Sequence, residues 1–151
     1  MENFKQTNLD DNILKAVTEM GFEKPTSVQA KTIPHLLNSN TDLIATAQTG
    51  TGKTAAFGLP SIHLTDLKNR DTSTLVLCPT RELCIQIAKD LTKYSKYVDG
   101  LSILAVYGGS DIRGQIKALN KGVHIVIGTP GRTKDLIKRN KLKIGSIARI
   151  V

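Results

Sequence analysis

A glycine-rich segment, ATAQTGTGKT, between Ala45 and Thr54, constrains this chain more than any other feature. It follows a short apolar run and precedes a stretch compatible with a helix, which is the arrangement of a phosphate-binding loop. Gly50 and Gly52 let successive backbone N–H groups converge, and the start of the following helix adds positive charge there. Lys53 can contact the β- and γ-phosphates, and the hydroxyl of Thr54 can bind Mg²⁺. The sequence therefore predicts a nucleotide site.

The length of 151 residues suits one domain that buries roughly two-thirds of the surface of its unfolded chain. No apolar run approaches the eighteen or so residues of a membrane span, and the N-terminus has no basic start followed by an apolar stretch. We therefore expect a cytoplasmic location. Cys78 and Cys84 are too few for a metal site and are not spaced as a redox pair, so we expect reduced, packed thiols.

The net charge of +8 arises entirely from residues 100–151, where ten Lys and Arg residues face only Asp111 and Asp135. A basic region of this kind suits a polyanion such as nucleic acid, although on charge alone a solvated basic face is the simpler interpretation. The chain has six aromatic residues and no Trp, so an aromatic platform for stacking bases is not expected. Contacts with a nucleic acid should therefore be mostly to its backbone.

Short apolar runs alternate with amphipathic stretches along the chain. Unlike half-buried strands, the apolar runs do not alternate with polar residues, which is typical of a parallel sheet covered on both faces. The fold class is therefore α/β. We expect helices over residues 10–20, 27–37, 54–67, 82–94, 112–119 and 133–139, and strands over residues 43–45, 75–78, 103–106, 123–127 and 148–151.

Polar and glycine-containing segments follow the carboxyl ends of these predicted strands, where open α/β sheets bind their ligands. After the phosphate loop they are Pro79-Thr80-Arg81-Glu82, Gly108-Gly109-Ser110 and Gly128-Thr129-Pro130-Gly131-Arg132. Each alone is more simply interpreted as a helix cap or a turn. Because all of them are expected at one edge of the sheet, together they indicate a site that binds phosphates.

Taken in order, these segments resemble the first RecA-like domain of DEAD-box RNA helicases over nearly the entire chain. GFEKPTSVQ, residues 21–29, resembles the family's Q motif, and Phe4 lies seventeen residues ahead of it, where the family has an isolated aromatic. AQTGTGKT resembles motif I, PTREL motif Ia, Gly108-Gly109 the GG motif and TPGR motif Ib. Ala47 stands where the general loop pattern has its first glycine. This substitution narrows the range of candidate families. Bacterial members are the most similar in pattern.

The resemblance implies ATP with Mg²⁺ as cofactors and RNA as the partner. Gln29 can bond both N6 and N7 of adenine, and Phe22 can pack on the purine. Lys53 and Thr54 are the implied catalytic residues, with Thr54 at the metal. The implied nucleotide site is Phe22, Lys24, Thr26, Gln29, Ala47, Gln48, Thr49, Gly50, Thr51, Gly52, Lys53 and Thr54. The implied contacts with the RNA backbone are Pro79, Thr80, Arg81, Glu82, Gly108, Gly109, Thr129, Pro130, Gly131 and Arg132.

The resemblance also implies a RecA-like P-loop domain with a Q-motif region and leading helices over residues 1–40 and a P-loop core over residues 41–151. The chain ends at Val151, before the family's acidic DEAD tetrad, so we expect 1–151 alone not to hydrolyse ATP. The parent would be an ATP-dependent RNA helicase. Two alternatives stay open: a DNA helicase of the same superfamily, and a non-catalytic module that binds ATP or RNA.

Overall fold

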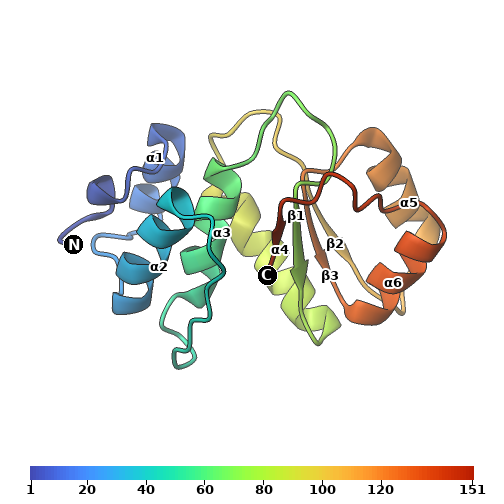
Figure 1. The fold of residues 1–151 in the computed structure, drawn as a ribbon, viewed down its shortest axis with the longest axis horizontal. Helices are drawn as coiled ribbons and strands as arrows, with labels where there is room; N and C mark the ends of the chain where they lie inside the picture. The colour runs from blue at the N-terminus through green and yellow to red at the C-terminus, as the bar shows by residue number, and fades with distance from the viewer. The chain divides into compact units, whose positions relative to one another are not determined.

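The computed structural model describes residues 1–151, which form two compact units. The first unit consists of Met1–Leu64 with Asp90–Asp99, and the second of Thr65–Lys89 with Gly100–Val151. Figure 1 shows the helices and strands along the chain. None of the helices has the length and apolar character needed to span a bilayer.

The first unit is helical. It contains a short 3₁₀ helix, η1 (Phe4–Thr7), followed by α1 (Asp11–Glu19), α2 (Ser27–Asn38) and α3 (Lys53–His63). The last residues of α4 (Arg81–Tyr94) also belong to it. Apolar residues at helical spacing on α1 point inward, as the sequence predicts. The fully buried side chains of this unit include Ile13, Val17, Ile33 and Leu59.

The second unit contains a four-stranded parallel sheet in the order β2-β3-β1-β4. The strands are β1 (Thr74–Leu77), β2 (Ile103–Val106), β3 (Ile125–Gly128) and β4 (Arg149–Ile150). Helices α5 (Ile112–Lys121) and α6 (Pro130–Lys138) complete the unit together with the first part of α4. The predicted parallel α/β sheet is therefore confirmed.

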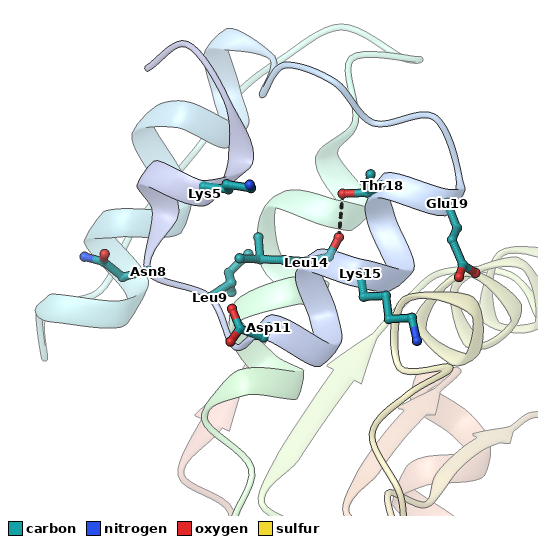
Figure 2. Close-up of a pocket in the computed structure, with 8 residues that line it drawn as sticks. All are labelled: Lys5, Asn8, Leu9, Asp11, Leu14, Lys15, Thr18 and Glu19. Atoms are coloured by element: carbon teal, nitrogen blue, oxygen red, sulfur yellow. Dashed lines mark hydrogen bonds between the residues drawn. The ribbon is translucent and has the colours of Figure 1, made fainter.

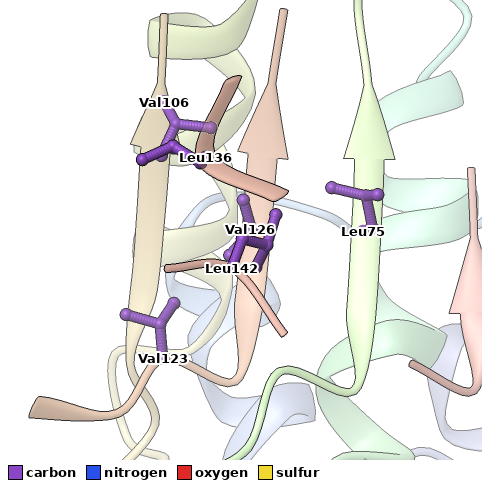
Figure 3. Close-up of a cluster of buried hydrophobic side chains, with 6 residues drawn as sticks. All are labelled: Leu75, Val106, Val123, Val126, Leu136 and Leu142. Carbon is purple, nitrogen blue, oxygen red and sulfur yellow. The ribbon is translucent and has the colours of Figure 1, made fainter. Parts of the chain in front are cut away.

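Both faces of this sheet are buried, which explains why the apolar runs do not alternate with polar residues. On one face, the paired residues Leu75 and Val126 join a cluster with side chains from α6 and its following loop (Figure 3). On the other face, Val76 and Ile127 are paired and almost fully buried. The cluster drawn in Figure 3 consists of Leu75, Val106, Val123, Val126, Leu136 and Leu142.

One predicted strand is wrong. Residues 43–45 form no strand, and the side chain of Ile44 is 95% exposed. An isolated extended segment has no neighbour for its backbone N–H and C=O groups, and the four strands of the sheet pair only with one another. All six predicted helices and the other four strands are present, with shifts at their ends, while η1 was not predicted.

His124 immediately precedes β3 and is 4% exposed. Its Nδ1 accepts a hydrogen bond from the backbone N–H of Ser102 at 3.0 Å, so Nε2 carries the proton of the neutral ring. Nε2 lies near the backbone of Asn69 without reaching hydrogen-bonding geometry. Burial outweighs this contact and lowers the pKa of His124 below its ordinary value of 6.5.

This lowered pKa makes stability depend on pH. As the pH falls through about 6.5, the unfolded chain takes up a proton on His124 before the folded chain does, so the free energy of unfolding should decrease. His124→Asn keeps an acceptor for the Ser102 N–H but does not titrate, and should flatten this dependence. Urea unfolding of both proteins across this pH range measures the effect. Identical pH profiles would contradict the prediction.

Candidate nucleotide and RNA site

The phosphate loop ends at a glycine that no other residue can replace without strain. Gly52 has φ 83° and directly precedes Lys53, the first residue of α3. A Cβ atom at Gly52 would lie 2.2 Å from Nε2 of Gln29. The absence of a side chain therefore lets α2 and the loop approach each other, and leaves the loop backbone open at the start of α3.

Two side chains of the phosphate-loop segment, those of Thr51 and Lys53, are held by carbonyl groups of the loop. Nζ of Lys53 donates to the carbonyl oxygens of Ala47 at 2.5 Å and Gln48 at 2.6 Å. The hydroxyl of Thr51 donates to the same Gln48 carbonyl at 2.7 Å. Lys53 is exposed, so its ammonium group can exchange these bonds for oxygens of a phosphate.

Two residues at the start of α2 hold this loop by hydrogen bonds. The hydroxyl of Thr26 donates to the carbonyl of Thr51 at 2.8 Å, and Nε2 of Gln29 donates to the carbonyl of Gly52 at 3.1 Å. The same two side chains form a capping box: Oε1 of Gln29 accepts from the Thr26 N–H at 3.0 Å, and the Thr26 hydroxyl accepts from the Gln29 N–H. Gln29 is 3% exposed. The sequence-predicted residues of the Q-motif segment and the loop are thus brought together.

Three aromatic rings of the first unit pack against one another. The ring of Phe22 lies 5.9 Å from that of Phe4 and 6.1 Å from that of Tyr94, with the second pair edge to face. Phe4 is buried and Phe22 is half-buried, while Lys24 is exposed. Burial raises the pKa of Tyr94 to about 12. Phe22 therefore keeps part of its ring accessible for a ligand.

In the second unit, the segment after β1 meets the segment after β2. The guanidinium carbon of Arg81 lies 5.0 Å from the centre of the Tyr107 ring, within the range of a cation–π contact. A Cβ atom at Gly109 would lie 3.6 Å from Nη1 of Arg81. The Thr80 hydroxyl accepts from the N–H of Leu83 at 3.2 Å and so caps the start of α4.

Arg132, at the start of α6, connects the segment after β3 with the segment after β2. Its Nη1 donates to Oε1 of Gln115 at 3.0 Å, and its Nη2 donates to the carbonyl of Ser110 at 3.1 Å. Nε2 of Gln115 in turn donates to the Ser110 hydroxyl at 2.9 Å and the Tyr107 carbonyl at 3.2 Å. Gln115, 7% exposed, therefore connects two of the predicted segments.

Sequence reasoning missed Tyr107 and Gln115 at this place, whereas it included Ser110 in the segment with Gly108 and Gly109. A signal for Gln115 was present, because it lies between Ile112 and Leu119 on the apolar side of α5, where a buried polar side chain needs partners. The remaining predicted RNA residues lie in the same strand-end segments. Pro79, Thr80, Arg81, Glu82, Gly108, Gly109, Pro130 and Gly131 are exposed, and Thr129 and Arg132 are partly buried.

A surface pocket of about 720 Å³ lies elsewhere in the first unit, beside η1 and α1 (Figure 2). Two of its polar side chains have local partners: the Thr18 hydroxyl donates to the Leu14 carbonyl, and Glu19 accepts from Lys96 and Tyr97. The bond from Lys96 lowers the pKa of Glu19. None of the predicted site residues lines this pocket. Its lining consists of Lys5, Asn8, Leu9, Asp11, Leu14, Lys15, Thr18 and Glu19.

Comparison with known proteins places this geometry in a family. Residues 26–151 match the model of the DEAD/DEAH box helicase family, and the chain belongs to that family. The resemblance in the sequence motifs is thereby confirmed.

Relatives of known sequence and structure agree with this assignment. The ATP-dependent RNA helicase CshA of Listeria monocytogenes is 51% identical over the whole chain, which spans 29% of that relative's length. A DEAD box protein from Methanococcus jannaschii matches 96% of the chain with a TM-score of 0.90 and 46% identity. Dbp5 of S. cerevisiae, bound to RNA and ADP BeF3, matches 97% with a TM-score of 0.87 and 29% identity. The chain covers 39% and 37% of these two structures.

The close approach at Gly52 generates a prediction about stability. Gly52→Ala should destabilise the protein more than Gly50→Ala, whose φ is also positive at 77° but which has no atom within 4 Å of an added Cβ. The left-handed backbone costs an alanine about 1–2 kcal/mol at either position. At Gly52 the displaced Gln29 amide also weakens the capping box, at a further cost of about 0.5–2 kcal/mol.

Chemical denaturation of the two variants measures this difference. In a Gln29→Ala background the collision is removed, so the two alanine variants should then cost nearly the same. An equal cost in the unaltered background would show that Gln29 does not constrain Gly52.

Proposed function

We propose that the first unit binds ATP with Mg²⁺ and that the second unit binds the backbone of RNA, as parts of an ATP-dependent RNA helicase. A cytoplasmic location, where ATP and RNA occur together, belongs to the same proposal. The observation that carries it is the convergence of Arg81, Gly109 and Arg132 from three separate strand ends. The chain spans about 29% of the length of its relative CshA, so unwinding and ATP hydrolysis by a whole protein are part of the proposal.

The phosphate loop supports the nucleotide part. The space that a side chain at Gly52 would fill, the start of α3 and the exposed ammonium of Lys53 fit a phosphate group. No cluster of three or more His, Cys, Asp or Glu residues could hold a metal by itself. Mg²⁺ would therefore enter with the phosphates and bind the Thr54 hydroxyl. Hydrolysis of the bound ATP would supply the free energy for remodelling RNA.

The side chains around this loop would select the base and orient the phosphates. Gln29 would bond the edge of adenine and the accessible part of the Phe22 ring would pack on its face, while the Lys24 backbone carbonyl adds an acceptor. Thr26 fixes the loop through the carbonyl of Thr51. In this way the base and the phosphates would be recognised by one connected set of residues.

The second unit would hold RNA by its phosphates. Arg132 and Arg81 present guanidinium groups from segments that are already fixed, and backbone N–H groups at the starts of α4 and α6 add donors. Such contacts carry little sequence information, so binding should depend little on RNA sequence. Two arginines that are fixed close together would let this unit hold an RNA strand and bend it.

The nucleotide part predicts selective but weak binding by the 151-residue chain. Calorimetric titration should show ADP and ATP binding with similar affinity and GDP binding more weakly. Lys53→Ala should lower the affinity about tenfold to a hundredfold, because a charged hydrogen bond contributes about 1.5–3 kcal/mol. Lys31→Ala, which removes an exposed lysine of α2, is the matched control. Equal affinity for GDP, or no loss in Lys53→Ala, would contradict the proposal.

The RNA part predicts a response to salt. Binding of single-stranded RNA should weaken steeply with salt, and Arg132→Ala should reduce the log–log slope by about one. Arg139→Ala is the control, because Arg139 caps the opposite end of α6 and pairs with Asp135 at 2.9 Å. Fluorescence anisotropy with RNA and with DNA of the same sequence measures both slopes. Equal effects of the two substitutions would indicate a general basic face, and preference for DNA would favour a DNA helicase.

A further inference from the structure

Two buried thiols of the second unit are in direct contact. Sγ of Cys78 lies 2.6 Å from Sγ of Cys84, and the two residues are 4% and 0% exposed. Both are free cysteines. A disulfide bond holds its sulfur atoms about 2.05 Å apart, so the two sulfur atoms already lie close to bonding distance.

The fold explains why residues six apart in sequence meet. Cys78 directly follows β1 and points to the opposite face of the sheet from Leu77, while Cys84 lies in the first turn of α4. The chain reverses within Pro79–Leu83, which returns α4 to the strand end. The spacing argument predicted reduced, packed thiols that do not form a redox pair. The reversal instead places the two thiols side by side.

We propose that Cys78 and Cys84 are a redox-modification site, at which a hydroperoxide converts the two thiols into an intramolecular disulfide. The sulfur of Cys78 attacks one peroxide oxygen, the O–O bond breaks, and a sulfenic acid forms as water or an alcohol leaves. The sulfur of Cys84 then attacks the sulfenic sulfur, the S–O bond breaks, and the hydroxyl group leaves as water with the Cys84 proton. The two thiols are oxidised by two electrons and the peroxide is reduced.

The environment of each sulfur sets the order of these steps. Burial raises the pKa of the Cys84 thiol to about 12, so Cys84 stays protonated and is the poorer first nucleophile. Cys78 is also the less buried of the two. Once Cys78 is a sulfenic acid, contact with Cys84 makes the second step intramolecular and favours it over a second peroxide molecule.

The disulfide would close a ring around Thr80 and Arg81, two residues of the proposed RNA contact. Without Cys84 as its partner, the Cys78 sulfenic acid would be oxidised further to a sulfinic acid, which thiol reductants do not reverse. A charged sulfinate buried between β1 and α4 would displace the start of α4 and with it Arg81. The cysteine pair would thus protect the RNA-binding segment; this consequence rests on the proposed function, whereas disulfide formation does not.

Digestion with trypsin after peroxide treatment tests the disulfide directly. Native protein is treated with hydrogen peroxide, alkylated under denaturing conditions and digested, and trypsin cleaves after Arg81, between the two cysteines. The peptides containing Cys78 and Cys84 should remain joined, with a mass lower by two hydrogens than their sum, and should separate after reduction. Cys84→Ala should instead give Cys78 as a sulfinic acid. Alkylated peptides, or a joined pair only when the protein is treated unfolded in urea, would overturn the proposal.

RNA binding of the treated proteins tests the protective role. The treated native protein should keep its RNA affinity, and treated Cys84→Ala should lose affinity that a thiol reductant does not restore. Untreated Cys84→Ala provides the reference for its folding and binding. Full affinity in treated Cys84→Ala carrying a sulfinic acid would overturn the protective role. Failure of untreated native protein to bind RNA would instead count against the proposed function, while the peptide masses would still report the disulfide.

Discussion

The parallel hydrogen-bonded ladder between β1 and β3 is the constraint on which the second unit depends. Strand β3 pairs with β2 on one side and β1 on the other, so their carboxyl ends meet at one edge. The register pairs Leu75 with Val126 and Val76 with Ile127, which buries apolar side chains on both faces at once. A shift by one residue would exchange the two faces. The positions of Arg81, Gly109 and Arg132 follow from this register.

Gln29 gives the first unit a comparable link, because one amide group serves both the helix and the loop. Its Oε1 accepts from Thr26 and its Nε2 donates to Gly52. A primary amide has two N–H donors and two acceptor positions, so one of each is still available. Those two are what bidentate contact with adenine requires. Under the proposed function, Gln29 would hold the phosphate loop and read a base at the same time.

The sequence predicted the helices, strands and turns that local patterns determine. It missed the features that depend on contact with another segment of the chain. Helices and buried strands follow from periodicity, and the three segments with Gly, Pro and polar residues after β1, β2 and β3 follow from the ends of strands. Residues 43–45 have the apolar character of a strand but no neighbour to pair with, and composition does not reveal that. Gln115 and the contact between Cys78 and Cys84 depend on how helices return to the sheet, which spacing along the chain does not specify.

The arginines at the strand ends combine a structural role with free capacity to bind. A guanidinium group has five N–H donors in a fixed plane, and the bonds from Arg132 to Gln115 and Ser110 use two of them. The guanidinium carbon of Arg81 lies over the Tyr107 ring, in a cation–π contact that helps to hold this side chain in place. Ordering these side chains during folding lowers the entropy lost when a ligand binds. Under the proposed function, a buried glutamine and a tyrosine ring would therefore strengthen phosphate binding without touching the phosphate.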